Sequence, residues 1–306
     1  MKNISRKITD SLQKMNISKV VIRPENEVIT EEGSKPNGLF GHTVIVKSGN
    51  ITLNNKDIDL EFTCPFDCDL EANEAEITIY NLTKNTISAL KYNQVITITA
   101  GYGNDTGIVF SGRISKVKTG YDGVEKRTVI YALDDQNLKD KELEEISYGA
   151  GTSSAYILKD LVKRLGLPIA VFKTRCEYSN EDSDKVDGSL IEIIGNYASQ
   201  CGVNVYIQKG KVYVHDIRTA SQDINFTINE NTGLIGSPEE FEEEVQEESH
   251  TEIIRGYNVE MLLQHRIQAG VKVKLVSREV SGYYTVRKGE HIYNGTDMIT
   301  FLEVIA

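Results

Sequence analysis

Apolar and polar residues alternate over residues 74–114, and this alternation predicts three strands with a short helix after the first. In the first strand Ile77 and Ile79 alternate with polar neighbours, which is the period of two expected when one face of a strand is buried. The second strand is expected over residues 95–100 and the third over residues 107–117. The stretch therefore predicts a β segment with one apolar face.

The short helix is expected to follow Thr83, whose side chain can cap the first turn. Ile87 and Leu90 lie three residues apart on one helical face, so both are predicted to point inward. The third strand is predicted to bury one residue in two, namely Ile108, Phe110, Gly112 and Ile114. The expected core of the segment consists of Ile77, Ile79, Ile96, Ile98 and Phe110.

Further alternating segments flank this stretch. Residues 43–47 and 60–63 bracket a polar loop through Asn54 and Asn55, which predicts that the two segments form a hairpin. Residues 126–133 form another predicted strand, and both of its faces are apolar, so a neighbouring domain or subunit is expected to cover its outer face. Several short strands with few helices predict a small β-barrel or sandwich.

Helical periodicity replaces the alternation in the middle of the chain. Residues 136–146 are charged and are predicted to be helical, and a second helix is expected to begin at residues 152–154. The inward face of this second helix is expected to consist of Ile157, Leu158, Leu161 and Leu165. A third helix is predicted over residues 189–201, and a hairpin follows with its turn at Lys209 and Gly210. These elements predict a compact α+β unit.

Strand patterns return in the last part of the chain. Glycine punctuates five alternating segments, as expected of a second β-barrel: residues 224–228, 253–263, 271–277, 282–287 and 298–304. Between the first two lies a run that contains seven glutamates, residues 239–248. Because like charges repel one another, this run is predicted to be a solvated loop, with contact to a basic partner surface as the alternative.

The first 40 residues do not share these patterns. A narrow apolar stripe at helical spacing consists of Ile4, Ile8, Leu12 and Met15. So short a helix is marginally stable alone in water, and it is therefore expected to dock either on the chain's own barrel or on a neighbouring subunit. Residues 20–22 are predicted to form a strand and residues 31–38 a polar loop.

The composition narrows the function classes. Hydrophobic residues make up 40% and charged residues 26% of the 306 residues, as in an ordinary soluble protein. The formal net charge of -11 argues against sequence-independent nucleic-acid binding, which depends on clustered Lys and Arg to neutralise phosphates. No specific nucleic-acid binding is expected either. No apolar run reaches the ~18 residues of a transmembrane helix, so no membrane insertion is expected. The start of the chain lacks the apolar core of a signal peptide, so assembly in a cytoplasm is expected.

The sequence presents no convincing catalytic, metal or cofactor constellation. The four cysteines contain no C-x-x-C pair, and they are expected to be reduced thiols: Cys64, Cys68, Cys176 and Cys201. A metal site at the first two, with His42 nearby, would lack the fourth ligand of a tetrahedral zinc site. Nucleophile-elbow, P-loop and Rossmann patterns are absent. We therefore predict no enzymatic activity, no catalytic residues, no metal and no cofactor.

Several segments resemble a known family. The order ITIYNL, a short helix, VITITAGY and IVFSGRI is similar to that of the baseplate hub proteins of contractile-tailed bacteriophages. These are the XkdQ-like and late-control-protein-D-like hubs, which are related in fold to the T4 hub protein. The segments LIEIIGNYASQCGVNVYI, GLIGSPE, MLLQHRIQAGVKV and GYYTV resemble the middle and last parts of the same family. The resemblance covers most of the chain from His42 onward.

The resemblance implies a structural role in a tail baseplate. In that family two tube-like β-barrel domains per chain assemble as a homotrimer, which gives a ring of six barrels between a six-fold tail tube and a three-fold spike. The implied partners are the spike, tube and baseplate wedge proteins, with the tape-measure protein as a further candidate. The particle would be a phage or a headless bacteriocin-like tail, assembled in the host bacterial cytoplasm. The negative charge would then face the central channel and discourage phosphate from binding.

Two alternatives remain open. The chain could be a tail-tube or distal-tail protein, which would form hexameric rings instead of trimers. It could also belong to a different class, as a cell-wall-binding or wall-degrading tail component.

The expected fold is mainly β with an α+β insert, in which two tube-like β-barrel domains flank a small helix-helix-hairpin domain. The predicted segments are an N-terminal arm, a first barrel, the α+β domain and a second barrel, over residues 1–40, 41–138, 139–222 and 223–306. Contacts with the next barrel of the ring are expected on the outer face of the first barrel. The candidate interface residues are Tyr80, Thr97, Thr99 and Arg113.

Overall fold

The computed structural model describes residues 20–22, 28–30, 41–134, 138, 141–175, 179, 181–246 and 251–306. The chain divides into two compact units, residues 1–40 and residues 41–306. In the first unit, β1 (Val20–Ile22) pairs with β2 (Val28–Thr30) in antiparallel fashion, which confirms the strand predicted over residues 20–22. The helix expected over residues 4–15 and the loop expected over residues 31–38 lie outside the described residues.

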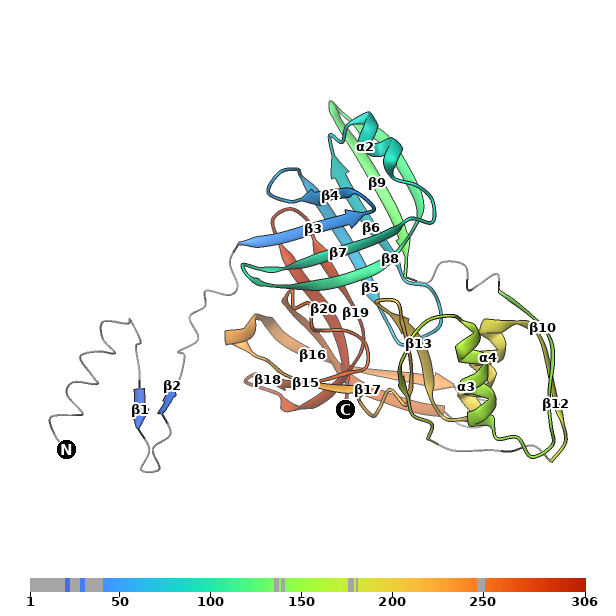
Figure 1. Cartoon of the computed structure of the whole chain (residues 1–306). Helices are drawn as coiled ribbons and strands as arrows, with labels where there is room; N and C mark the ends of the chain where they lie inside the picture. The colour runs from blue at the N-terminus through green and yellow to red at the C-terminus, as the bar shows by residue number, and fades with distance from the viewer. Residues whose placement is uncertain are drawn as a thin grey trace. The chain divides into compact units, whose positions relative to one another are not determined.

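In the second unit, thirteen of the described strands form one hydrogen-bonded sheet (Figure 1). The strands of its first half are β3 (His42–Ser48), β4 (Ile51–Asn54), β5 (Leu60–Phe66), β6 (Glu74–Tyr80), β7 (Val95–Tyr102), β8 (Asp105–Asp122) and β9 (Glu125–Leu133). Those of its second half are β15 (Gln222–Ile228), β16 (Leu234–Gln246), β17 (Thr251–Leu262), β18 (Val271–Val276), β19 (Ser281–Tyr293) and β20 (Met298–Ile305).

The strand order of this sheet runs through both halves. The main path is β16-β17-β20-β19-β5-β6-β9-β8-β7-β3-β4, and β18 joins β15 to β19 beside it. Three α-helices are described. Two of them lie in the insert between the halves, and the third is a short helix between β6 and β7. These elements confirm the predicted fold class, which is mainly β with a small helical insert.

The two halves meet where β5 pairs with β19. Phe62 lies opposite Tyr293 and Phe66 lies opposite Gly289, so antiparallel backbone hydrogen bonds cross the junction. A Cβ atom added to Gly289 would lie 2.3 Å from the carbonyl oxygen of Phe301 and 2.6 Å from the Phe66 ring. Because both neighbours approach so closely, this position requires glycine.

The first half has the core that alternation predicts. The inward positions of β6 and β7 are fully buried: Ala75, Ile77, Ile79, Ile96, Ile98 and Ala100. The helix α2 (Lys84–Ala89) begins after Thr83, whose side-chain oxygen accepts a hydrogen bond from the Thr86 amide at 3.1 Å. Leu90 is buried and Ile87 is half-buried, as the predicted helix face requires.

The hairpin predicted between residues 43–47 and 60–63 is wrong. β3 instead turns directly into β4, and Gly49 adopts a φ of 56° in the two-residue connection. Such a tight turn favours glycine, because glycine has no Cβ atom and therefore adopts a positive φ without steric strain. β5 then pairs with β6 and β19, so it is free to connect the two halves.

The predicted inner face of the third strand is also partly wrong. Phe110 and Ile114 are buried, but Ile108 is 46% exposed and Val109 is buried instead. The register between β7 and β8 shifts at this point: Phe110 faces Ile98, whereas Ile108 faces Thr99. A β-bulge reverses the side-chain alternation, and the sequence pattern does not reveal it.

The strand expected over residues 126–133 is present as β9, and its two faces differ. Thr128, Ile130 and Ala132 are fully buried. On the other face Val129 is buried at 7% exposure, whereas Tyr131 and Leu133 are half-buried. That a neighbouring subunit covers this second face stays a prediction.

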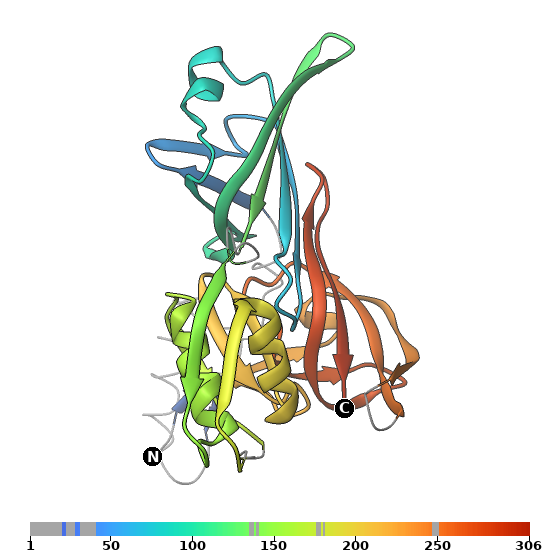
Figure 2. The same ribbon diagram turned by 90° about the vertical axis from the view of Figure 1, so that its right-hand side faces the viewer.

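The insert packs two helices against small sheets (Figures 1 and 2). Its elements are β10 (Glu142–Tyr148), α3 (Ser154–Arg164), β11 (Ile169–Phe172), β12 (Asp184–Ser189), α4 (Leu190–Gln200), β13 (Asn204–Gln208) and β14 (Lys211–His215). The two predicted helices after residue 150 and the predicted hairpin are confirmed. At the hairpin turn Lys209 and Gly210 have φ values of 50° and 72°, as a type I′ turn needs.

The helix predicted over residues 136–146 is wrong in its described part. Residues 142–148 form β10, which pairs with β12 in a two-stranded sheet. Leu143 and Ile146 are half-buried against the core of the insert. Pairing with β12 therefore overrides the helical propensity of the charged residues around them.

The loop predicted for the acidic run is wrong as well. Residues 239–246 belong to β16, which pairs with β17. Phe241 lies opposite Gly256, and a Cβ atom on Gly256 would lie 2.8 Å from the Phe241 ring, so the ring packs directly on the neighbouring backbone. Glu240, Glu242 and Glu244 remain exposed, so strand pairing does not desolvate these charges. The end of the run, residues 247–248, lies outside the described residues.

Substitution of Gly289 by alanine is expected to destabilise the junction between the two halves. The added Cβ would collide with the Phe301 carbonyl group and the Phe66 ring, and overpacking of this kind costs about 1–3 kcal/mol. The measurement is the urea unfolding midpoint of G289A against the unmodified chain. The control is G149A, whose Cβ would meet no atom within 4 Å. Equal midpoints for the two variants would contradict this account of the junction.

Candidate interaction surfaces

Three of the four candidate interface residues lie together on the outer face of β7 and β8. Thr97 lies opposite Ser111, Thr99 lies opposite Ile108, and Arg113 lies opposite Val95. The Arg113 side chain is exposed and donates a hydrogen bond to the Asn93 carbonyl group at 2.9 Å. These residues therefore share one surface, as the sequence suggested.

Tyr80 lies elsewhere. Tyr80 is the last residue of β6 and lies opposite Arg127 of β9. Arg127 in turn lies opposite Gly120 of β8, and Gly120 is seven residues further along that strand than Arg113. The Tyr80 hydroxyl group lies 3.4 Å from Glu61, and partial burial together with that carboxylate raises the Tyr80 pKa. Tyr80 is thus part of a second surface, and contact of either surface with another copy stays a prediction.

Two exposed apolar side chains enlarge the surface around the threonines. Val95 is 48% exposed and Ile108 is 46% exposed, and both lie on the outer face of the β7–β8 pair. We define the outer patch as Val95, Thr97, Thr99, Ile108 and Arg113. The sequence pattern assigned Ile108 to the core, so the apolar part of this patch was missed.

The β8–β9 hairpin presents another exposed apolar site. It continues beyond the pairing with β6 and β7, and its tip is visible as the long green hairpin of Figure 2. Tyr121 is 77% exposed and Val124 is 96% exposed near the turn. Both side chains are therefore available for contact with another chain.

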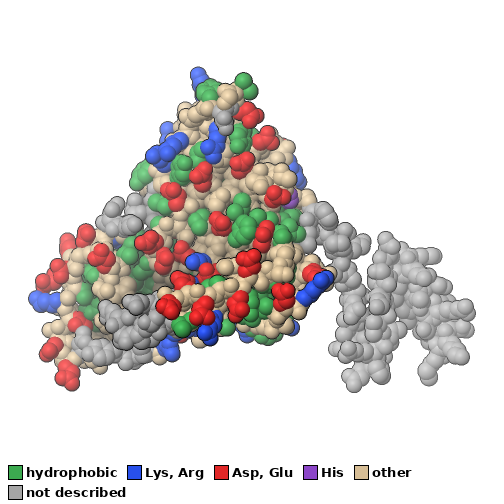
Figure 3. Space-filling model, turned by 180° about the vertical axis from the view of Figure 1, so that it is seen from behind, with side chains coloured by type: hydrophobic (Ala, Val, Ile, Leu, Met, Phe, Trp, Pro, Cys, Tyr) green, Lys and Arg blue, Asp and Glu red, His purple; other side chains and the backbone are tan. Residues whose placement is uncertain are grey.

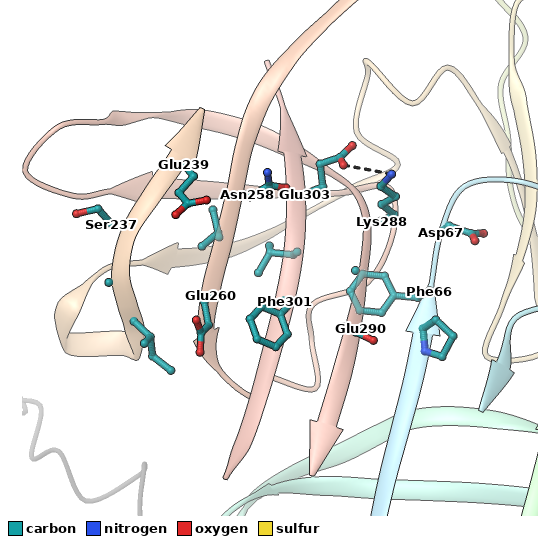
Figure 4. Close-up of a pocket in the computed structure, with 16 residues that line it drawn as sticks. Phe66, Asp67, Ser237, Glu239, Asn258, Glu260, Lys288, Glu290, Phe301 and Glu303 are labelled. Atoms are coloured by element: carbon teal, nitrogen blue, oxygen red, sulfur yellow. Dashed lines mark ion pairs between the residues drawn. The ribbon is translucent and has the colours of Figure 1, made fainter. Parts of the chain in front are cut away.

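A groove crosses four neighbouring strands of the second half and β5 (Figure 4). One row of outward residues runs across β16, β17, β20, β19 and β5, in the order Ile235, Glu260, Phe301, Glu290 and Pro65. A parallel row runs through Glu239, Asn258, Glu303 and Lys288. The groove has a volume of about 720 Å³, and apolar and acidic side chains alternate along its first row. We call this surface the acidic groove.

The acidic groove carries more carboxylates than its own cation can balance. Among the described residues that line it, Lys288 is the only cation, and its ammonium group lies 3.3 Å from Glu303. Glu303 also pairs with Arg287 at 2.7 Å. Glu239, Glu260 and Glu290 have no ion-pair partner in the part of the chain that the structure describes. Acidic side chains also predominate over basic ones on the face shown in Figure 3.

A charged cluster links the two halves of the sheet a second time. Asp105 of β8 accepts hydrogen bonds from Arg266 at 2.6 and 2.8 Å and lies 3.1 Å from the His265 ring. The hydrogen bonds from Arg266 hold the Asp105 pKa well below its usual range, and burial lowers the His265 pKa. Lys209 of the insert donates a hydrogen bond to the His265 carbonyl group at 3.1 Å. Both halves and the insert therefore meet at this cluster.

Buried histidines and cysteines serve the core. His291 contacts Thr300 at 2.8 Å and the Ile267 carbonyl group at 3.3 Å, and burial lowers its pKa to about 3. Cys64 faces His291 across the junction, and burial raises the pKa of its thiol. No group of three or more metal-binding side chains occurs among the described residues, and Cys176 lies outside them. No described helix is long and apolar enough to cross a membrane.

Comparison with known protein families decides the classification. A family described as baseplate hub gp41 matches residues 40–291, which is most of the chain. The chain belongs to the baseplate hub gp41 family. This confirms the resemblance found in the sequence, and it assigns the protein to the structural components of phage tail baseplates. No curated protein sequence matches the chain.

Solved structures share the fold of this hub-family protein. A tail protein from Neisseria meningitidis MC58 has 11% identity and a TM-score of 0.60, with 87% of this chain and 97% of that chain covered. The 43 kDa tail protein of prophage MuSo2 from Shewanella oneidensis has 8% identity and a TM-score of 0.62, with 86% and 98% covered. The E. coli c3393 protein, a type VI secretion component, has 9% identity and a TM-score of 0.58, with 85% and 76% covered.

Replacement of Asp105 by asparagine is expected to destabilise this hub-family protein in a pH-dependent manner. The Asp105 pKa is lower in the folded state than in the unfolded chain, so the ionised carboxylate stabilises the fold above about pH 4. That contribution is lost as the pH falls through the folded-state pKa. Because the pair is partly exposed, the loss at pH 7 should be about 0.5–1 kcal/mol.

The measurement is the thermal unfolding midpoint of D105N and the unmodified chain at pH 7 and at pH 3. E242Q is the matched control, because it removes an exposed charge pair with Arg255 that lies within the second half. A D105N difference that is the same at both pH values would contradict the assigned role of the Asp105 charge.

Proposed function

We propose that this protein is the trimeric hub of a contractile tail baseplate, where it adapts a six-fold tail tube to a three-fold spike. The observation that carries the proposal is the baseplate hub gp41 match over residues 40–291. The pairing of β5 with β19 supports it, because backbone hydrogen bonds hold the two β halves of each chain in a fixed relation. Three chains can present six similar barrels to a six-fold tube only if the two β halves have the same arrangement in every copy.

The proposed partners are two further copies of the chain, the spike, tube and wedge proteins, and the tape-measure protein. Residues 41–138 and 223–306 would act as the two tube-like barrels, residues 139–222 as the insert between them and residues 1–40 as an arm. The role is structural and not enzymatic. The protein would be assembled in the host bacterial cytoplasm and would reside in the baseplate of a phage or of a headless tail, with its negative charge toward the channel.

Within this assembly, the outer patch is the proposed contact between neighbouring barrels. It combines two exposed apolar side chains with the Thr97 and Thr99 hydroxyl groups and the Arg113 guanidinium group. Interfaces of this kind combine an apolar centre with polar groups around it. Tyr80 and the tip of the β8–β9 hairpin provide further candidate contacts on the same half of the sheet.

The purified chain is expected to assemble as a trimer at micromolar concentration, alone or with its spike protein. Native mass spectrometry would show a species with three times the mass of the chain. Hexamers would favour a tail-tube or distal-tail ring protein instead. Monomers that form no complex with the spike protein would contradict the hub proposal.

The substitution Ile108→Glu is expected to weaken the assembly without unfolding the chain. Ile108 is 46% exposed, so a charge is tolerated in the monomer, but burial of that charge in an interface should raise the dissociation constant about tenfold or more. Sedimentation across a concentration series provides the measurement. Y156E, at a 63% exposed aromatic residue of α3, is the control. Equal dissociation constants for both variants would remove the outer patch from the interface.

A further inference from the structure

The acidic groove combines an apolar side chain on its floor with carboxylates that pair with no cation of the described residues. Glu260 and Glu290 lie on either side of Phe301, which is 36% exposed between them (Figure 4). Neither carboxylate has a cation partner among the described residues. An occupant that covered Phe301 would desolvate both carboxylates, so a stable occupant has to supply an apolar surface and positive charge together.

The start of the chain has both properties in its sequence. Its apolar stripe consists of Ile4, Ile8, Leu12 and Met15. Asp10 is the only acidic residue in the first 23, against six basic ones, which are Lys2, Arg6, Lys7, Lys14, Lys19 and Arg23. The whole chain has a formal charge of -11, so this basic segment contrasts strongly with the rest.

The dimensions of the two elements also agree. A helix over residues 4–15 would be about 18 Å long, at 1.5 Å per residue. The first row of the acidic groove crosses five strands from Ile235 to Pro65, which corresponds to about 19 Å at the usual strand spacing. A helix laid across the strands would therefore span the groove from one side to the other.

We propose that the acidic groove of one copy binds the basic amphipathic segment at residues 1–23 of a neighbouring copy. This inference rests on the proposed self-assembly of the hub. The described residues of each copy supply this groove and its first 23 residues supply the segment, so the contact is heterologous and can repeat around a closed ring. The apolar stripe would cover Phe301, and the lysine and arginine side chains would pair with Glu239, Glu260 and Glu290.

The test uses the full chain with a photo-crosslinking amino acid, p-benzoylphenylalanine, in place of Leu12. Assemblies are formed from this chain at natural isotope abundance together with uniformly ¹⁵N-labelled chain that lacks the crosslinker. After illumination, mass spectrometry identifies the linked peptides, and their isotopes show whether they come from two copies. The expected links join residue 12 to groove peptides of the labelled copy, within residues 235–239, 258–260, 288–290 or 301–303.

Charge reversal in the groove provides the second arm of the test. E260K/E290K in the labelled chain should lower the yield of these links about tenfold, since attraction becomes repulsion. The matched control is E74K/E279K, which makes the same charge change at two exposed positions outside the groove. Thermal unfolding of both variants verifies that they fold.

The outcomes separate this inference from the hub proposal. Trimers whose links lie outside the groove, or within one copy, overturn the inference and leave the hub proposal standing. An equal yield from E260K/E290K and from its control also overturns it. Monomers by native mass spectrometry, both without and with the spike protein, overturn both.

Discussion

Between residues 62 and 66 the backbone of β5 pairs with β19, and the remaining architecture depends on this antiparallel contact. β19 pairs with β18 along its first residues and with β5 along its last ones, and the register against β20 shifts between Val286 and Lys288. The intervening Arg287 pairs with Glu243 and Glu303, and its carbonyl group accepts a hydrogen bond from Cys68. Both backbone pairing and side-chain contacts therefore stabilise the point at which β19 changes its neighbour from β18 to β5.

The spacing of apolar residues in the sequence predicted helices and strands correctly where burial of one apolar face alone determines the structure. The alternation at Ile77 and Ile79 and the helical spacing of Leu158 and Leu161 both reflect one apolar face against a core, and both were confirmed. The pattern failed where a partner distant in sequence decides the structure. β10 is a strand because β12 pairs with it, and the bulge at Val109 is set by its register against β7.

The surfaces were less predictable than the core. Thr97, Thr99 and Arg113 could be grouped from the sequence because they alternate with buried residues on adjacent strands. The acidic groove could not be found in this way, since it needs the strand order β16-β17-β20-β19-β5, which joins residues more than 200 positions apart. Only the excess of acidic residues in the sequence pointed toward such a surface.

The two end strands of the main path of the sheet have a consequence for the subunit before it is incorporated into a particle. Within the described strands the main path ends at β16 and at β4, and each presents unpaired backbone groups that another sheet could join. β16 carries Glu239, Glu240, Glu242, Glu243 and Glu244, and β4 is only four residues long. Charge and shortness both oppose uncontrolled edge-to-edge polymerisation. The acidic run would thus keep newly made subunits soluble until a specific partner binds.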